Sequence, residues 1–414
     1  MKTIKNRIKK KYFHLRQSIL PSHHDKLQRL GIEKAKWLGG AQSPVMLMID
    51  DFSNAWHSEK GQPIWDRGGD WGGGLNRSGS AFSLLAENLL NDFPEVRVTF
   101  FTVAGKISHY VYGLPFTYAE SLTHNEETKA FFRSIHDDKR FEIAYHGYDH
   151  GRPGVSTEEF TQEWNGFRSV EEACDQIKKG KDIFREVFCT YPLGGKYGGW
   201  EYNEFADESI DRSEFLWWCR DWTPRETGQG AKSTRYEPQF FGRNCVIALP
   251  STIHGFYWSK KQIETLLSKE QIISIEEHIA PIRPDGRIQR PNILDDFREL
   301  RRLFAYLRKK NVWHATGTEI ATYFMAYSQS VICNVTPNRF SIRYSGKIEK
   351  PILTLRLDCS GMCSPNNPHI RVFLPNGACV PHSDFKYDTL GYLHLVNLPV
   401  LEGDYLVEET NVSL

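Results

Sequence analysis

Short apolar segments alternate with amphipathic, helix-like segments from residue 45 to residue 327, and this alternation constrains the fold more than any other feature. The first run, residues 45–50, is apolar up to its last residue, as expected of a strand buried on both faces. Further strands are predicted at 96–105, 141–147, 215–222, 245–252, 272–277 and 312–316. Strands that alternate with helices over this length predict an α/β fold, with a parallel sheet closed or nearly closed into a distorted (β/α) barrel.

Helix positions follow from apolar spacing and from capping boxes. Residues 81–90 and 291–310 carry apolar side chains at helical spacing, so each predicts an amphipathic helix. Ser156 with Glu159 is predicted to open a long helix after the third strand, and Thr316 with Glu319 the last helix of the barrel.

The sequence changes character after Tyr327, and we predict a domain boundary there. Residues 328–414 contain strand-like segments separated by Gly, Pro and Asn, with no helical period. This pattern of short strands and turn residues predicts a separate, β-sandwich-like accessory domain. With a basic N-terminal segment at 1–40, the α/β barrel domain is predicted over 41–327.

The N-terminal segment is basic, although the whole chain has a net charge of only +1. Residues 1–40 hold eight Lys and three Arg against one Asp and one Glu. They lack the apolar run of a secretory signal or a membrane span, so we expect a cytoplasmic protein whose eight cysteines are reduced. Peripheral contact with an anionic inner membrane surface is one role for this segment, and a solvated tail or a packed helix is the alternative. The near-neutral total argues against a nucleic-acid partner.

Two polar motifs follow predicted strands at what would be the same end of the sheet. Asp50 and Asp51 end the first strand, and His146-Gly-Tyr-Asp-His150 follows the third. The carboxyl ends of barrel strands are where active sites form. Two imidazoles and a carboxylate suit a divalent cation, zinc above all, with one position left open for water. For the Asp pair, a solvated turn is the alternative.

These residues resemble the motifs of the polysaccharide deacetylases of the NodB-homology type. The run MLMIDD is similar to the family's first motif, residues 98–103 (VTFFTV) to its second strand, and His146 and His150 to its HxxxH motif. Arg220-Asp221-Trp222 is similar to the fourth motif, and IISIEEHI, the helix after it and VWHATGTEIA resemble the fifth. The resemblance covers about residues 45–325, with the motifs in the family's order, and it implies the deacetylase type of distorted barrel.

The resemblance implies metal-assisted hydrolysis of the N-acetyl group of an amino sugar in a polysaccharide or glycan precursor. Asp51, His146 and His150 would hold the metal, and Asp50 would act as general base. His278 is the expected general acid, with His254 as its rival. Trp222 would stack on a sugar, Asp221 would orient a nearby cation, and a backbone N–H near Tyr197 would assist the oxyanion.

One departure from the family pattern lies in the third motif, where the expected Arg is absent. The corresponding stretch, Tyr191–Trp200, offers Lys196 instead, which would supply a point charge beside Asp50. If 191–200 is only a Gly-rich turn, another cation faces Asp50. The missing Arg also keeps open a glycan-binding protein with impaired catalysis. The basic N-terminus keeps open a deformylase or deacetylase of a lipid-linked sugar.

Overall fold

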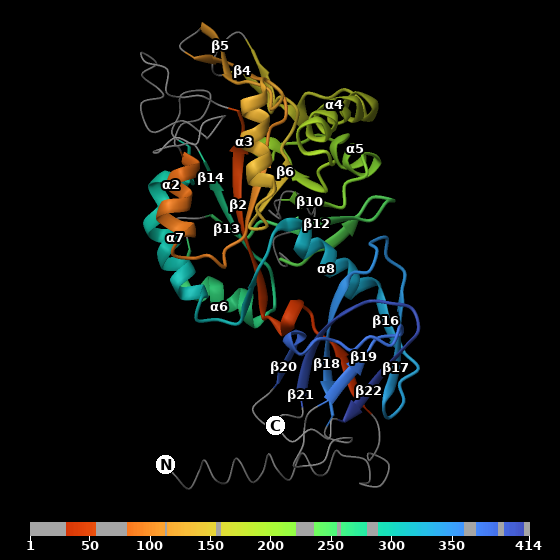
Figure 1. Cartoon of the computed structure of the whole chain (residues 1–414). Coiled ribbons are helices and arrows are strands. Elements are labelled where there is room, and N and C mark those ends of the chain that lie inside the picture. The colour runs from red at the N-terminus through yellow and green to blue at the C-terminus, as the bar shows by residue number, and fades with distance from the viewer. Residues whose placement is uncertain are drawn as a thin grey trace. The chain divides into compact units, whose positions relative to one another are not determined.

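The computed structural model describes residues 30–54, 81–111, 114–154, 159–220, 236–254, 258–279, 289–359, 370–387 and 393–409. The chain divides into two compact units, one formed by Ala41–Phe324 and the other by Met1–Gly40 together with Met325–Leu414 (Figure 1). Residues 1–29, which include most of the basic segment, lie outside the described residues. Within the described residues, no helix combines the length and the apolar character needed to cross a membrane.

The unit Ala41–Phe324 is built on one large mixed sheet, in which β2 (Ser43–Phe52) is an interior strand with neighbours on both sides. Its strand order is β11-β12-β10-β9-β6-β3-β2-β14-β13, and β15 also pairs with β2. The remaining strands are β3 (Val98–Thr102), β6 (Phe141–Tyr145), β9 (Gly194–Lys196), β10 (Trp217–Arg220), β11 (Gln239–Phe241), β12 (Val246–Pro250), β13 (Ile253–His254), β14 (Ile273–His278) and β15 (Val312–His314).

The sheet confirms the predicted α/β class, because every pairing in it is parallel except that of β11 with β12. The predicted barrel, closed or nearly closed, is not confirmed, since the order of described strands has two ends, at β11 and β13. Along the chain, only Ser251 and Thr252 separate β13 from β12, the strand next to β11.

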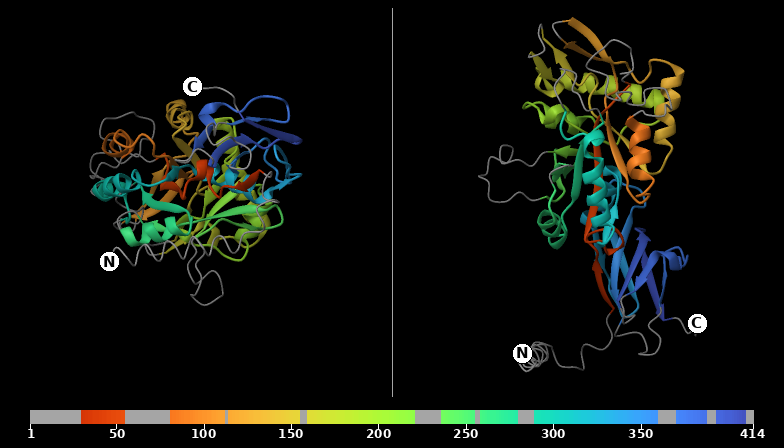
Figure 2. Two further views of the ribbon diagram at one scale, coloured as in Figure 1. Left: turned by 90° about the horizontal axis from the view of Figure 1, so that it is seen from below. Right: turned by 90° about the vertical axis from the view of Figure 1, so that its left-hand side faces the viewer.

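Helices cover the sheet and meet one another in two groups. In one, α7 (Ile293–Leu307) packs beside α2 (Ala81–Leu85) and the π-helical turn η2 (Ala86–Leu90) (Figures 1 and 2). In the other, α4 (Val170–Phe188) contacts both α3 (Glu126–His136) and α5 (Ala206–Arg212). The remaining helices are α6 (Lys260–Ser268) and α8 (Gly317–Gln329).

The two predicted capping boxes have different outcomes. Thr316 and Glu319 cap each other at the start of α8, as predicted: the Thr316 backbone N–H donates to Glu319 Oε2 (2.8 Å) and the Glu319 N–H to Thr316 Oγ1 (3.3 Å). The helix start predicted at Ser156 is wrong, because α4 begins at Val170 and its cap is Ser169, whose Oγ accepts from the Glu172 N–H (3.1 Å). Ser156 itself lies outside the described residues. The same Ser-x-x-Glu spacing occurs twice within 17 residues, and only the second copy precedes an amphipathic run.

Strand alternation gives β2 two buried faces. Val45, Leu47 and Ile49 belong to an apolar cluster that includes side chains of the covering helices. Met48, on the opposite face, contacts Cys219 of β10, with 3.5 Å between the two sulfur atoms. Asp50 therefore continues an inner face that begins with apolar side chains.

The second unit contains two four-stranded antiparallel sheets. The first has the order β1 (Gly31–Lys34), β18 (Ile352–Asp358), β21 (Leu393–Pro399), β20 (Phe385–Tyr387). The second has the order β16 (Ser330–Cys333), β17 (Arg339–Tyr344), β22 (Asp404–Glu409), β19 (Ile370–Phe373). The predicted β structure after residue 328 is thus present, and it takes in β1 from the N-terminal segment. A sandwich packing of the two sheets remains a prediction.

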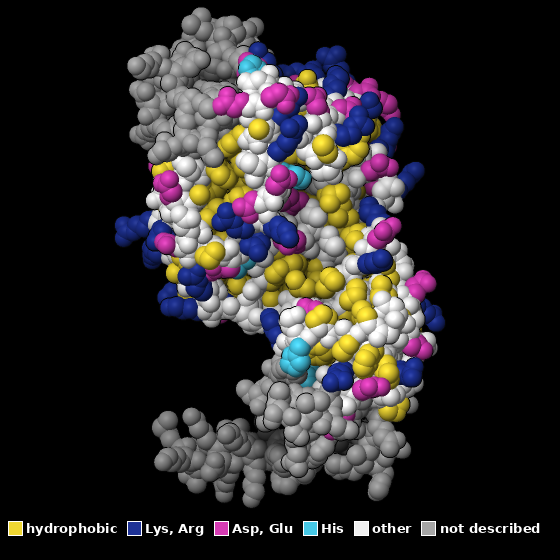
Figure 3. Space-filling view, in the orientation of Figure 1, with side chains coloured by type: hydrophobic (Ala, Val, Ile, Leu, Met, Phe, Trp, Pro, Cys, Tyr) yellow, Lys and Arg dark blue, Asp and Glu magenta, His cyan; other side chains and the backbone are white. Residues whose placement is uncertain are grey.

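Charged side chains of both signs are interspersed over the visible face of the molecule (Figure 3). This distribution agrees with the net charge of +1. No disulfide joins the cysteines that the structure describes, which exclude Cys363.

Candidate active site

A β-bulge at the end of β2 lets two consecutive aspartates serve neighbouring groups. In a regular strand, successive side chains point to opposite faces. Here the register with β3 shifts between Ile49 and Phe52, and Asp51 has a left-handed φ of 60°. Such a bulge breaks the alternation and re-aims the side chains beside it. As a result, the carboxylate of Asp50 faces the ammonium group of Lys196, and the carboxylate of Asp51 faces the imidazoles of His146 and His150.

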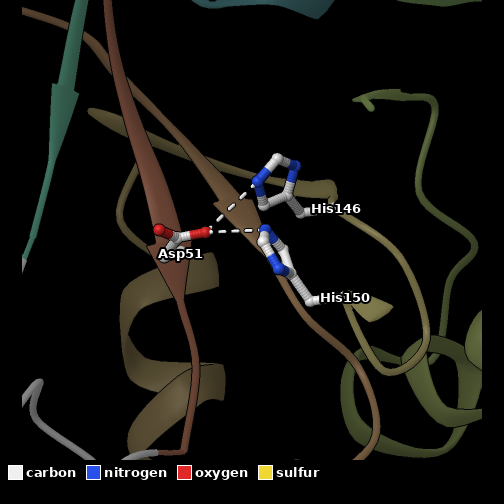
Figure 4. A group of neighbouring side chains, drawn as sticks. All are labelled: Asp51, His146 and His150. Atoms are coloured by element: carbon white, nitrogen blue, oxygen red, sulfur yellow. Dashed lines mark ion pairs between the residues drawn. The ribbon is translucent and has the colours of Figure 1, made fainter. Parts of the chain in front are cut away.

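Asp51, His146 and His150 form one cluster (Figure 4). Asp51 Oδ1 lies 3.4 Å from His146 Nε2 and 3.0 Å from His150 Nε2. The candidate donor atoms of the three residues lie within 4.8 Å of one another. The two histidines meet because the chain turns sharply after β6, with φ of 105° at Gly147 and 61° at His150.

The surroundings prepare this cluster to bind a cation. His146 Nδ1 contacts the backbone carbonyl of Lys196 (3.0 Å), so Nδ1 carries the hydrogen and Nε2 keeps its lone pair for the cluster. The buried His150 Nε2 has no hydrogen bond of good geometry in the described structure. Burial acts to raise the pKa of Asp51, but His150 and His146 outweigh it and lower the pKa well below its usual range. Burial acts to lower the pKa of His150, and Asp51 reverses the effect to a net rise, so a proton and a metal compete for this ring.

A buried lysine lies beside the cluster, at the end of β9. Lys196 is fully buried; its Nζ donates to Asp50 Oδ2 and to Glu276 Oε1 (2.7 Å). The Trp200 ring covers the ammonium, with 3.7 Å from Nζ to the ring centroid, and its Nε1 donates to Glu276 Oε1 (2.8 Å). Burial alone would lower the pKa of Lys196, but Asp50 and Glu276 raise it above the ordinary value. The lysine is therefore held as a cation.

The formal charges of the site suit a divalent cation. The carboxylates of Asp50, Asp51 and Glu276 and the ammonium of Lys196 together carry a formal charge of −2 when the imidazoles are neutral. Two imidazole nitrogens and a carboxylate oxygen are typical zinc ligands and leave a fourth position open. The residues present therefore fit a divalent metal.

The register of β14 brings Glu276 and His278 to the same side of the sheet. Glu276 pairs with Met48 and His278 with Asp50, and alternation turns Glu277 to the opposite face. His278 Nδ1 contacts the Pro291 carbonyl (2.9 Å), and its Nε2 lies 3.8 Å from Asp50 Oδ2. His254, the rival acid, pairs with Glu276 through the backbone of β13.

Of the three other predicted site residues, one lies in the core and two are not described by the structure. Asp221 and Trp222 lie outside the described residues. Tyr197 is fully buried, donates through its hydroxyl to Asp207 Oδ1 (2.8 Å) and stacks on Tyr202. The phenol of Tyr197 is thus a core group and cannot contact a substrate. Stabilisation of the oxyanion by a backbone N–H near Tyr197 stays a prediction.

Sequence reasoning missed Glu163 and Trp200, and it did not decide whether Glu276 lies in the site or in solvent. Glu163 lies in a short 3-10 turn, Glu163–Asn165, with no motif around it. Trp200 ends the Gly-rich stretch that was matched to the third motif, so its nearness to Lys196 in sequence was the available signal. For Glu276, the available signal was its position two residues before His278, because strand alternation places both side chains on the same face.

No protein-family model matches the chain, and no curated protein matches it. A Mycobacterium smegmatis structure assigned as a polysaccharide deacetylase is 19% identical, with a TM-score of 0.45, covering 71% of this chain and 94% of that one. The structure of Puue allantoinase is 15% identical, with a TM-score of 0.45 and coverages of 70% and 92%. A family 4 acetyl xylan esterase from Clostridium thermocellum is 11% identical, with a TM-score of 0.33 and coverages of 68% and 91%.

The first of these structures bears the name of the class of protein that the motifs resemble. Identities of 11–19% and TM-scores of 0.33–0.45 assign no activity to this chain. A functional assignment therefore depends on the residues of the site.

Proposed function

We propose that the protein is a metal-dependent hydrolase that removes the N-acetyl group from an amino sugar of a glycan or glycan precursor. The observation that carries the proposal is the division of roles between adjacent aspartates. Asp51 faces two imidazoles, whereas Asp50 is held by an ammonium group. A divalent cation, with zinc preferred, would be held by Asp51, His146 and His150, and when bound it supplies Lewis-acid polarisation and a more acidic water.

Asp50 is the general base in this proposal. Lys196 occupies its Oδ2, while the buried Oδ1 has no hydrogen-bond partner in the described structure. Oδ1 is therefore the oxygen that accepts a proton from the attacking water. Lys196 fixes the orientation of the carboxylate while this happens.

His278 is the general acid. Its Nδ1 is held by the Pro291 carbonyl, so Nε2 is the nitrogen that faces Asp50 and the reacting groups. A proton on Nε2 can pass to the departing amine of the sugar. The sugar and its acetyl group are inferred from the resemblance of the motifs to polysaccharide deacetylases.

The matched pair Asp50→Asn and Asp51→Asn tests the proposal. Asp50→Asn should keep bound metal and lose turnover by about 10²-fold or more, a typical loss for general acid–base catalysis. Asp51→Asn should lose the metal as well, because it removes a charged ligand. Metal content after dialysis against trace Zn²⁺, and acetate release from N-acetylated glycans, free and lipid-linked, measure both effects.

Three outcomes contradict this proposal. Wild-type protein without metal after dialysis rules out the cation site. An Asp50→Asn variant with near-wild-type turnover moves the base to another residue. Protein that binds metal and glycan but releases no acetate from any of these substrates is a binding protein.

A further inference from the structure

One buried carboxylate accepts hydrogen bonds from the backbone of the turn that follows His146 and contains His150. Glu163 is 4% exposed, and its Oε1 accepts a hydrogen bond from the Tyr148 N–H (3.0 Å). Its Oε2 accepts from the N–H groups of Asp149 (3.1 Å) and His150 (2.9 Å). Three successive backbone donors therefore converge on one side chain from a different part of the chain.

This convergence requires the unusual backbone of the turn. Consecutive N–H groups outside a helix converge where left-handed residues alternate with right-handed ones or form a turn, which creates an anion-binding concavity. Gly147, His150 and Gly151 have φ of 105°, 61° and 143°. A Cβ at residue 147 would lie 2.3 Å from Glu163 Oε2, so glycine at this position also admits the carboxylate.

A second contact holds the same turn through a side chain. Asp149 Oδ1 accepts from the Gly151 N–H (3.1 Å), and Oδ2 accepts from Gln176 Nε2 of α4 (3.1 Å). This contact restrains the tip of the turn but does not reach the N–H of His150. Glu163 alone bonds to the backbone of the histidine itself among the contacts described here.

We infer that Glu163 is a positioning residue for the cation site, holding the 147–151 turn so that His150 Nε2 meets Asp51. The part of this inference that concerns the metal rests on the proposed function. The inference about the turn rests only on the three hydrogen bonds. Groups that orient metal ligands typically change metal affinity by about 10–100-fold when they are substituted.

The test compares Glu163→Gln with Glu142→Gln in the full chain. A glutamine at 163 keeps one oxygen acceptor but presents an NH₂ group to the remaining backbone donors. Glu142 also accepts hydrogen bonds, from the Thr318 N–H (3.0 Å) in the first turn of α8 and from Thr99 Oγ1 (3.3 Å) of β3. Glu142 is half-buried and lies near the start of β6, whereas His146 follows the end of this strand, so its substitution controls for the loss of a hydrogen-bonded carboxylate away from the turn.

Three measurements separate positioning from general destabilisation. In metal-free protein, Glu163→Gln should speed amide hydrogen exchange within 148–150 by about tenfold or more, since an NH₂ group replaces one of the two acceptor oxygens. Zn²⁺ should bind about tenfold or more weakly. The visible spectrum of bound Co²⁺ should also change, because it reports ligand geometry. Glu142→Gln should match the wild type in all three.

The outcomes distinguish this inference from the proposed function. Unchanged exchange at 148–150 in Glu163→Gln overturns the positioning of the turn. Faster exchange with wild-type Zn²⁺ affinity and an unchanged Co²⁺ spectrum overturns its importance for the metal. Wild-type protein that binds neither metal overturns the proposed function instead, and the exchange rates then decide whether Glu163 holds the turn.

Discussion

Glu276 and Glu277 are neighbours on β14 and equally deep, at 2% and 0% exposed, but the two faces of the strand give them different surroundings. On the inner face, Glu276 Oε1 accepts hydrogen bonds from Lys196 Nζ and from Trp200 Nε1. On the outer face, neither carboxylate oxygen of Glu277 has a hydrogen-bond partner within the described structure. Burial, followed by Asp296 and Glu276, raises the pKa of Glu277 well above its usual range.

The difference shows what allows charge to remain on a buried strand. An ionised group in the interior is costly unless a charged partner and hydrogen bonds compensate it. Lys196 provides both a charged partner and a hydrogen bond for Glu276. Glu277 has neither, and its raised pKa favours the protonated, uncharged form. The inner face therefore holds the charges that the proposed chemistry needs, and the outer face holds a neutral acid.

The largest effect is expected from Lys196→Met, which removes the cation from the inner face. Asp50 and Glu276 would then be two buried carboxylates without a compensating charge. Breaking a buried ion pair costs about 3–5 kcal/mol of unfolding free energy. Urea denaturation measures this loss, and turnover should fall as well, because Asp50 loses the donor that orients it.

Two further variants make that result specific. Lys181→Met is the matched control, because the Lys181 ammonium donates to the Ser213 carbonyl (2.6 Å) rather than to a carboxylate. Lys196→Arg should restore part of the stability and activity, since it returns the charge in a different shape. If Lys196→Met and Lys181→Met cost the same, the ion pair does not stabilise the inner face.

The inner face was the more predictable of the two from sequence. Asp50, Asp51, His146 and Lys196 all follow or end strands of one parallel sheet, whose carboxyl ends meet at one edge. Glu276 and Glu277 were less predictable, because identical adjacent residues differ only in the face that the β14 register gives them. Glu163 was not predictable, since its partners are backbone donors in a turn with left-handed residues.

A smaller effect is expected from Trp200→Phe, which tests the hydrogen bond that Glu276 receives beside the lysine. Phenylalanine keeps an aromatic face over Lys196 but lacks the indole N–H. A hydrogen bond to a charged group contributes about 1.5–3 kcal/mol, so we expect a loss near the lower end of that range. The control is Trp217→Phe, whose Nε1 donates to the neutral Thr318 Oγ1 (2.8 Å) and should cost about 1 kcal/mol. Equal losses in the two variants would mean that the charge of Glu276 adds nothing to its hydrogen bond.

An effect of opposite sign is expected from Glu277→Gln on the outer face. The folded protein binds the Glu277 proton more tightly than the unfolded chain does, because the pKa is raised on folding. Stability therefore falls as the pH rises above the unfolded value of about 4.5, where the unfolded chain releases the proton first. Glutamine has the shape of the protonated acid and cannot ionise, so it removes this fall. At pH 8 the variant should therefore be more stable than the wild type by about 1 kcal/mol or more, because each pH unit over which only the unfolded chain has released the proton costs about 1.4 kcal/mol.

The pH dependence separates this explanation from a simple gain in packing. The advantage of Glu277→Gln should be close to zero at pH 4.5 and should grow steadily toward pH 8, as followed by thermal unfolding at each pH. Glu204→Gln at an exposed site should show no such trend, because that carboxylate is not buried. An advantage that is the same at every pH would come from side-chain packing instead. A loss of stability at pH 8 would mean that Glu277 is ionised and compensated in the folded protein, which would remove the contrast between the two faces of β14.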